Sequence, residues 1–416
     1  MSVQPRPAVT AQEIAGERRL RQLLAVVDLL AFLGIGAAAL YIWRFWPRGH
    51  DVYSDLQQGA SETYLFIWMG IALVGALTAL SRKTRVISFA LSFLLLLECL
   101  AQLYFYEVNH HPYHPNARAI LNRFQPHPLL GAIPRPGAFG GISHDAMHLR
   151  TTINEGKASD AKLVFVFGGS SAYDLGVIDS ETWASDLSRL LGPHFLVRNY
   201  GVPGYGSREA MIQSLFVFRD IKPACAVYYE GWNDLRNAHY NNERSDYSSL
   251  QVMHIMDSLA ISYRPGDLVN NWLFLQLIDR MIQQGPGFPP YGGTVSAEKD
   301  PRLSQIYMEN MRMVADIDGH FGVTPIFVPQ ILNYDRIEAH YDGEWATIPG
   351  PAVRPLMADL NEDLEQVAKE TGTVFLDGPL NATWQVTDFL DDGHFSAAGA
   401  AKFAQAIAPA IAANCK

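Results

Sequence analysis

The sequence has few cysteines and few charged residues for its length. Only three cysteines, Cys99, Cys225 and Cys415, occur in 416 residues, and their number and spacing predict neither a disulfide framework nor a zinc site. Charged residues make up 18% of the chain, and no basic stripe lies beyond the first ninety residues. Because nucleic-acid binding requires such a basic surface, a nucleic-acid partner is excluded.

Metal-binding patterns are also scarce. The formal net charge is −10, and the thirteen histidines are scattered along the chain. One local group, His110, His111 and His114, is interrupted by proline, which favours a loop over a metal site. We therefore expect no metal and no cofactor.

Hydrophobic residues, in contrast, make up 49% of the chain and concentrate near its amino end. Three apolar runs stand out there: Leu23 to Trp43, Tyr64 to Leu80 and Val86 to Tyr106. The first is long enough to span a bilayer, and it is too long for a simple signal peptide and lacks a suitable cleavage site. We predict three transmembrane helices within residues 23–106. In the alternative, two runs span the bilayer and the first is a buried soluble helix.

Basic residues flank these runs unevenly, and the loop 47–63 between the first two runs has only Arg48. Because basic residues favour the cytoplasmic side, we predict a cytoplasmic tail over residues 1–22 and an extracytoplasmic location for everything after the third run. The expected localisation is the inner (plasma) membrane, with the lipid bilayer as a partner and another membrane protein as a further candidate. The flanking basic residues are Arg18, Arg19, Arg21, Arg82, Lys83 and Arg85.

Two acidic residues, Asp28 and Glu98, lie inside the predicted spans, where a charge is costly and often functional. With a rise of about 1.5 Å per residue their depths differ by roughly 10 Å, which argues against a direct pair. Glu98 shares a helix face with Gln102, so we interpret it as a packing residue of the helix bundle. A proton or substrate path is the alternative.

The rest of the chain divides into a collar and a larger domain. Residues 107–155 are rich in proline, glycine and histidine, which is typical of a linker. From residue 156 to 416 strands and helices alternate, which predicts a parallel sheet covered on both faces. Residues 235–300 interrupt this rhythm and are long enough for a lid, a binding loop or a capping subdomain. The expected strands are Leu163–Phe167, Phe195–Asn199, Cys225–Tyr229, Pro325–Val328 and Val374–Leu376.

Four polar or glycine-rich stretches follow predicted strands: Gly168–Ser171, Asn199–Ser207, Gly231–Asp234 and Asp391–His394. Ligands of open α/β sheets bind at the carboxyl ends of strands, and glycine lets a substrate approach the backbone closely. Taken alone, the first stretch fits an ordinary turn between strand and helix as well as it fits a nucleophilic serine.

In this order the four stretches resemble the SGNH hydrolases, also called the GDSL esterase/lipase superfamily, over roughly residues 120–416. The resemblance implies a flavodoxin-like, doubly wound parallel sheet. It also implies that Ser170 is the nucleophile, that His394 is the general base and that Asp391 orients the histidine. The sequence departs from the family at Gly169, where the family has aspartate.

This assignment agrees with the chemistry. A serine hydroxyl is a poor nucleophile at neutral pH and needs a base to take its proton. The base must be held in one tautomer by an acceptor on its other nitrogen, and an aspartate three residues before His394 can reach that nitrogen. Ser171 remains an alternative nucleophile, and Asp392 remains a competitor of Asp391.

The resemblance also implies an oxyanion hole, formed by the backbone amides of Ser170 and Gly204 and the side chain of Asn233. Such preorganised donors act where negative charge develops in the transition state. A turn residue is the less favoured alternative for Asn233 taken alone. Three aromatic residues are weaker candidates for substrate contact, because aromatic side chains beside a sheet are more often packing residues: Tyr173, Tyr205 and Trp232.

We therefore predict a membrane-anchored serine esterase or acyltransferase that works through an acyl-serine intermediate. Water as the second acceptor gives an esterase and a sugar hydroxyl gives a transferase, and the sequence does not choose between them. By analogy with the family, the expected acyl ester substrate is an O-acetyl group of a cell-surface or exported polysaccharide. A lipid or lysophospholipid ester is the second choice. The rival from another class is a catalytically idle scaffold that binds a polysaccharide or a membrane partner.

Overall fold

The structure is a computed structural model that describes residues 84–109, 123–240 and 293–415 apart from 342, together with 69–78, 273–274 and isolated positions between 15 and 37. The chain forms two compact units. The first comprises residues 1–50, 54–117 and 263–285, and the second comprises 51–53, 118–262 and 286–416. Part of the predicted insertion, residues 263–285, therefore belongs to the amino-terminal unit and not to the unit that carries the sheet.

The amino-terminal unit contains helix α3, Arg85–Asn109, which confirms a helix over the third apolar run. Among the helices that the structure describes, none combines the length and the apolar character needed to cross a bilayer. The described helices therefore do not support the prediction of three spans. The first and second predicted spans lie partly outside the described residues.

Glu98 of α3 is fully buried, with 0% of its surface exposed. Its carboxylate accepts hydrogen bonds from the backbone amides of Leu273 at 3.0 Å and Phe274 at 2.8 Å. Charge-assisted hydrogen bonds of this kind are about twice as strong as neutral ones. They fasten residues 273–274 to α3 within the amino-terminal unit, which agrees with the packing role expected for Glu98.

The second unit is built on a five-stranded parallel sheet with the strand order β11-β8-β7-β5-β6. Its first strand in the chain, β5, lies between the second and the third, as in flavodoxin-like doubly wound sheets. This confirms the predicted parallel sheet, with each strand within one residue of its expected bounds. The strands are β5 Lys162–Gly168, β6 Phe195–Asn199, β7 Cys225–Tyr229, β8 Thr324–Val328 and β11 Val374–Phe375.

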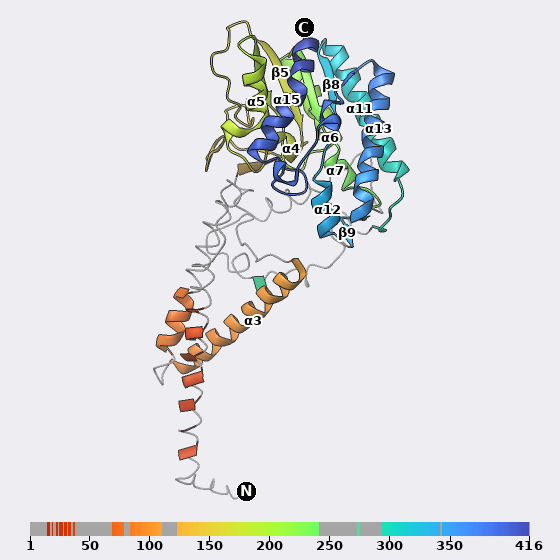
Figure 1. Cartoon of the computed structure of the whole chain (residues 1–416). Helices are drawn as coiled ribbons and strands as arrows, with labels where there is room; N and C mark the ends of the chain where they lie inside the picture. The colour runs from red at the N-terminus through yellow and green to blue at the C-terminus, as the bar shows by residue number, and fades with distance from the viewer. Residues whose placement is uncertain are drawn as a thin grey trace, which may run out of the picture. The chain divides into compact units, whose positions relative to one another are not determined.

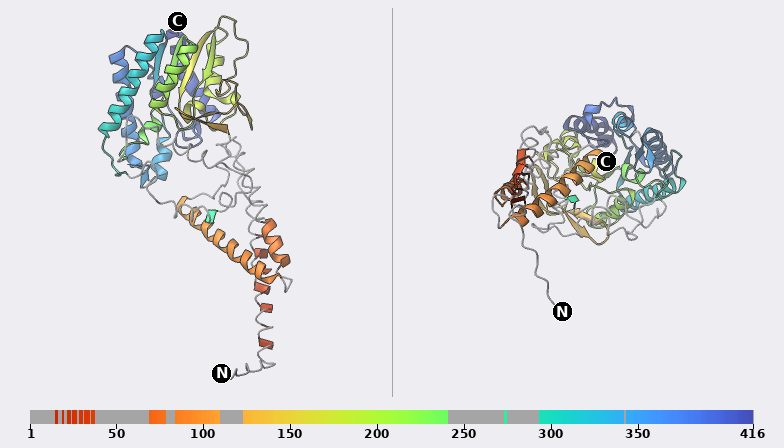
Figure 2. Two further views of the ribbon diagram at one scale, coloured as in Figure 1. Left: turned by 180° about the vertical axis from the view of Figure 1, so that it is seen from behind. Right: turned by 90° about the horizontal axis from the view of Figure 1, so that it is seen from below.

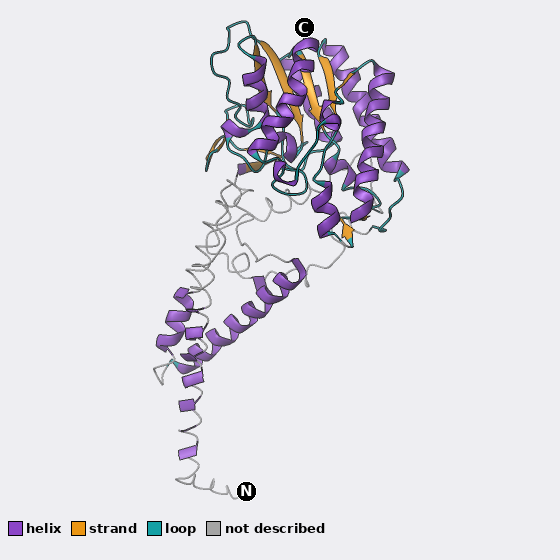
Figure 3. Ribbon diagram, viewed as in Figure 1, coloured by secondary structure: helices purple, strands orange, loops and turns teal. Residues whose placement is uncertain are grey.

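Helices cover both faces of this sheet (Figure 1 and Figure 2). Helices α5 Trp183–Leu191 and α15 Ala397–Asn414 pack on one face. Helices α6 Ser207–Asp220, α11 Pro301–Phe321 and α13 Val353–Thr371 pack on the other. Short helices fill the connections at the carboxyl edge (Figure 3): α4 Ser170–Tyr173, α7 Trp232–Leu235, α12 Tyr334–His340 and α14 Gly378–Asn381.

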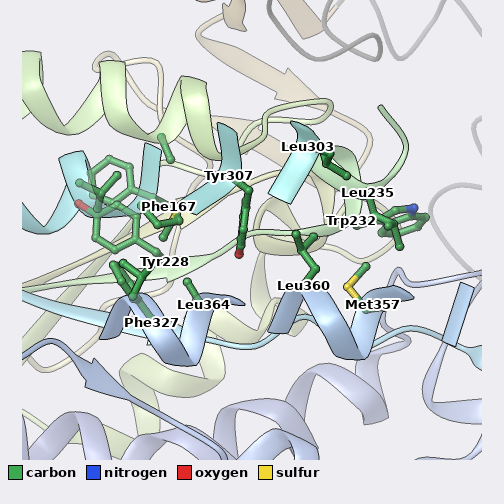
Figure 4. Close-up of a cluster of buried hydrophobic side chains, with 14 of the residues drawn as sticks. Phe167, Tyr228, Trp232, Leu235, Leu303, Tyr307, Phe327, Met357, Leu360 and Leu364 are labelled. Carbon is green, nitrogen blue, oxygen red and sulfur yellow. The ribbon is translucent and has the colours of Figure 1, made fainter. Parts of the chain in front are cut away.

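The alternation of side chains along β5 explains the two layers. Phe165 and Phe167 pack into the cluster that includes α6, α11 and α13, whereas Val164 and Val166 pack into the cluster that includes α5 and α15. All four are fully buried, and burying a side chain of this size stabilises the fold by about 1.5–3 kcal/mol. Figure 4 shows the first of these clusters, with Phe167 beside Tyr228.

Residues at the helix ends explain where the helices begin and end. The Thr182 hydroxyl accepts a hydrogen bond from the Ser185 backbone amide at the start of α5. At the start of α15 the Ser396 hydroxyl accepts one from the Gly399 backbone amide. Gly322 and Gly372 end α11 and α13 in the left-handed conformation, with φ of 73° and 69°.

The collar contains regular structure where the sequence suggested an irregular linker. Strand β1 Phe124–His127 pairs with β2 Gly131–Pro134, and β3 Gly137–Phe139 pairs with β4 Ile142–His144, both antiparallel. Glycines with positive φ allow the turns, among them Gly140 at 61°. Several of the glycines that suggested a linker are therefore turn residues of two short hairpins, and residues 110–122 lie outside the described residues.

Cys225 and Cys415 form a disulfide, which the number and spacing of the cysteines did not predict. Cys225 begins β7 and Cys415 follows the end of α15, which returns along the sheet to the start of that strand. Their separation of 190 residues explains why the spacing gave no signal. Both cysteines are buried, so the crosslink lies within the core.

Candidate active site

Ser170 is the first residue of α4 and follows β5 across two glycines. Gly168 has a φ of +152°, and a Cβ there would lie 2.5 Å from the carbonyl oxygen of Tyr229. Only glycine therefore lets β5 end this close to β7. Ser170 is 9% exposed and lines a small hollow at the carboxyl ends of β5, β7 and β8.

Ser171, the alternative nucleophile, has its hydroxyl engaged. It donates a hydrogen bond to the carbonyl oxygen of Gly393 at 3.2 Å. The Ser171 carbonyl in turn accepts from Trp183 Nε1 at 2.9 Å. Ser171 therefore ties α4 to the loop that carries His394, which leaves Ser170 as the favoured nucleophile.

Asp391 and His394 lie together as the resemblance implied. His394 Nδ1 lies 2.6 Å from Asp391 Oδ2, and Asp391 Oδ1 accepts from the backbone amides of Gly393 and His394 at 3.0 and 2.9 Å. Because a carboxylate only accepts, Nδ1 carries the proton. The other nitrogen, Nε2, is buried and has no hydrogen-bond partner among the described residues. It can therefore act as a proton acceptor.

The charge of Asp391 is secured by its surroundings. Burial by itself raises the pKa of this carboxyl group, but attraction to His394 and the hydrogen bonds from His394 and Gly393 outweigh burial and lower the pKa to about 2. A lowered pKa contributes stability above the ordinary pKa of about 4 and loses it as the pH falls through about 2. Asp391 is therefore ionised across the neutral and mildly acidic range.

Asp392, the competitor of Asp391, faces a different set of groups. Its backbone is fixed by Asn333, whose backbone amide donates a hydrogen bond to the backbone carbonyl of Asp392 at 2.7 Å. Because its carboxylate is occupied elsewhere, Asp392 anchors the loop and Asp391 is the partner of His394. The Asp392 carboxylate accepts hydrogen bonds from Tyr341 Oη at 2.9 Å, Trp345 Nε1 at 3.3 Å and Arg336 Nε at 3.3 Å.

Trp232, a weak candidate for substrate contact, packs against the histidine. The ring centroids of Trp232 and His394 are 4.8 Å apart, with the planes at 47°. A Cβ at Gly393 would lie 2.7 Å from the Trp232 ring, so glycine allows this approach. Trp232 thus holds the imidazole from one side while Asp391 holds it from the other.

Asn233 of α7 lines the same hollow as Ser170. Its Nδ2 donates to the carbonyl oxygen of Tyr205 at 2.7 Å, which fixes the orientation of the amide. A Cβ at position 169 would lie 2.5 Å from this Nδ2 and 2.7 Å from the Tyr205 carbonyl oxygen. Glycine at position 169 thus makes room for Asn233.

The loop around Gly204, whose φ is +89°, is fixed by two buried carboxyl groups that the sequence analysis did not single out. Asp234 accepts from the hydroxyl of Ser207 at 2.6 Å and from its amide at 3.2 Å. Glu209 accepts from the amide of Gly206 at 3.1 Å. Because these contacts span residues 206 and 207, they fix the segment that follows Gly204.

Tyr173 and Tyr205 do not offer the substrate contact that the sequence suggested. Their exposed fractions are 0% and 1%. The Tyr173 hydroxyl lies 2.7 Å from His144 Nε2, and the Tyr205 hydroxyl donates to the Ala132 carbonyl at 2.6 Å. Both side chains bind the hairpins of residues 124–144 within the sheet-bearing unit, a role that a single sequence does not reveal.

No group of three or more His, Cys, Asp or Glu side chains in the described part of the chain is arranged to hold a metal ion. The histidines at 110, 111 and 114 lie outside the described residues. The local chemistry is that of a serine, a histidine and carboxyl groups.

No protein-family model and no curated protein sequence matches the chain. Among solved structures, TesA is similar at 14% identity and a TM-score of 0.36, over 60% of this chain and 98% of that one. Axe2, an acetylxylan esterase from Geobacillus stearothermophilus, is similar at 15% identity and a TM-score of 0.35, over 62% of this chain and 96% of that one. LAE5, an alpha/beta hydrolase enzyme from the metagenome of Lake Arreo, Spain, is similar at 14% identity and a TM-score of 0.35, over 62% of this chain and 97% of that one. Similarities this weak do not decide the activity, for which the site geometry is the guide.

The contact between Asp391 and His394 gives a first test. We predict that Asp391→Asn lowers kcat for an aryl acetate by about 10,000-fold, because the amide favours the wrong tautomer of His394. The adjacent Asp392→Asn is the matched control, and it should retain activity within about tenfold. The comparison is made by steady-state kinetics on both variants. An equal fall in kcat in the two variants would contradict the assignment of Asp391 as the partner of His394.

The fit at Gly169 gives a second test. Gly169→Ala should displace the Asn233 amide and lower kcat by about 100- to 1000-fold, the usual cost of losing one oxyanion donor. Gly319→Ala on α11, where a Cβ meets nothing within 4 Å, is the control and should leave kcat unchanged. Unaltered kcat in a folded Gly169→Ala protein would show that Asn233 does not depend on this gap.

Proposed function

We propose that this chain is an SGNH-type serine esterase or O-acyltransferase that works through an acyl-Ser170 intermediate. The observation that carries the proposal is the pairing of His394 with Asp391, while the buried Nε2 of His394 has no hydrogen-bond partner among the described residues. The hydrogen bond from Ser171 to Gly393 brings this pair to the helix that begins at Ser170. A catalytically idle scaffold would not need a histidine whose tautomer is fixed by an ionised aspartate.

In the proposed reaction, Ser170 Oγ attacks the ester carbonyl carbon while its proton passes to His394 Nε2. The developing oxyanion accepts hydrogen bonds from the Asn233 side chain and the backbone amides of Ser170 and Gly204. His394 then returns the proton to the leaving alcohol, which departs and leaves the acyl group on Ser170. Water or a sugar hydroxyl attacks that ester in turn, with His394 again as the base.

We further propose that the protein acts outside the cytoplasm and is anchored to a membrane. The three apolar runs and their basic flanks support this proposal. On α3, Phe93, Leu96 and Leu100 are 53%, 52% and 54% exposed, more apolar surface than one helix usually leaves to water. The buried disulfide gives independent support, since disulfides persist in oxidising compartments and are rare in the cytosol.

The proposed substrate is an O-acyl, especially O-acetyl, group of a cell-surface or exported polysaccharide. This choice follows the family resemblance and the proposed location. Ester-linked acyl groups of such polymers are accessible to a domain held outside the membrane, and either water or a sugar hydroxyl is available there as the second acceptor. A lipid ester is the competing substrate class.

The nucleophile is tested by comparing neighbouring serines. Ser170→Ala should abolish turnover of p-nitrophenyl acetate, because the attacking oxygen is lost. Ser171→Ala should retain turnover within about tenfold, because it removes only one hydrogen bond to Gly393, worth about 1 kcal/mol. Retained activity in Ser170→Ala with loss in Ser171→Ala would move the nucleophile by one residue.

The proposed anchoring is tested by cysteine labelling in intact cells, in a Cys99→Ala background. An impermeant maleimide should label Ser54→Cys in the loop 47–63 and should not label Ser81→Cys, because the basic turn at 81–85 is expected in the cytoplasm. The reverse pattern would contradict the orientation. Recovery of the protein in the soluble fraction would contradict the anchoring itself.

A further inference from the structure

Glu230 has no role in the mechanism above, yet it lines the same hollow as Ser170 and Asn233. It directly follows β7 and is only 2% exposed. Its Oε1 is buried and has no hydrogen-bond partner among the described residues. A buried carboxyl group with an unsatisfied oxygen is costly, so its position beside the nucleophile calls for a function.

The residues around Glu230 form a wall that cannot move aside easily. The Tyr229 hydroxyl accepts from Gln330 Nε2 at 3.0 Å and from the Ile331 amide at 3.3 Å. Gln330 is also held through its backbone, whose amide and carbonyl both bond the Asn361 side chain at 2.9 Å. Tyr229 and Gln330 are 1% and 2% exposed, and both line the hollow.

The groups near Glu230 raise the pKa of its carboxyl group. Burial raises its pKa well above the ordinary value, and the neighbouring carboxyl groups of Asp234 and Glu209 raise the pKa further. On the side of α11, the Tyr307 hydroxyl donates to the Glu230 carbonyl at 3.4 Å. No cationic side chain contributes to this shift. Burial and these carboxyl groups therefore favour the neutral form of Glu230, which is a polar residue of the wall.

We propose that Glu230, with Gln330 beside it, is a specificity-determining residue that closes the acyl side of the hollow and restricts the enzyme to short acyl groups such as acetyl. The inference rests on the proposed function, because it assumes that Ser170 is acylated. It deepens that function by choosing O-acetyl esters over the long-chain esters of lipids.

The physical reason is the size and polarity of the wall. The hollow beside Ser170 is close to a water molecule in size, which is also about the size of a methyl group. A longer acyl chain would have to displace Glu230 or Gln330 from a close-packed edge of the sheet. The methylenes of such a chain would also contact polar groups with which they cannot form hydrogen bonds. Discrimination of about 10–200-fold per methylene is usual in such pockets.

The test compares acyl chain lengths on the full chain purified in detergent. Release of p-nitrophenol from the acetate, butyrate and octanoate esters is measured in a single turnover with enzyme in excess, so that only acylation of Ser170 is observed. Butyrate has two more methylenes than acetate, so we expect the wild type to prefer acetate by about 100-fold or more. Glu230→Ala should raise the ratio of butyrate to acetate rates by about tenfold.

Glu230→Gln is the matched control, because it keeps the size and polarity of the neutral side chain, and it should retain the wild-type ratio. If Glu230→Ala does not fold, Gln330→Ala trims the same wall and should shift the ratio in the same direction. A parallel fall with all three esters would assign Glu230 a merely structural role and overturn the inference.

Failure of the inference can be separated from failure of the proposed function. Equal rates of the wild type with octanoate and acetate would overturn the inference while supporting an esterase. Reaction of Ser170 with neither an ester nor a fluorophosphonate would overturn the proposed function, and the inference with it.

Discussion

The close approach of β5 to its neighbours at Gly168 and Gly169 is the constraint on which the site depends. A Cβ at the first position would meet the backbone of Tyr229, and one at the second would meet Asn233. Two successive glycines therefore allow Ser170 and Asn233, the proposed nucleophile and oxyanion donor, to lie at the ends of adjacent strands. Since parallel strands all end at this edge, the groups meet without any long-range adjustment of the fold.

The other part of the site, the loop that carries Asp391 and His394, lies more than 200 residues after Ser170 in the sequence and is fixed by contacts of its own. The loop from Asp391 to His394 is held by Asn333, packed under Trp232 and joined to α4 through Ser171. The histidine is thus oriented by contacts with several elements, of which its partner Asp391 is one. Orientation of this kind is what a general base requires, because a small displacement of the base costs much of the rate.

The sequence predicted those elements that depend only on the pattern of neighbouring residues. Buried strands such as Cys225–Tyr229 are short apolar runs, so their predicted bounds agree with the structure. The disulfide, with 190 residues between its cysteines, depends on the path of α15 and has no local signal. Contacts that only the fold creates, such as the burial of Tyr205 by the collar, were likewise beyond the sequence. Glu230 did leave one signal, an acid directly after a buried strand.

Fluorophosphonate labelling of the purified full chain, with the adduct mapped by mass spectrometry, tests the central claim most directly. The account predicts an adduct on Ser170 that is lost in His394→Ala, because the probe reacts with a serine only when a base has activated it. An adduct on another residue, or none in a protein shown to be folded, would contradict an activated serine at this site and favour a scaffold that binds a polysaccharide or a membrane partner.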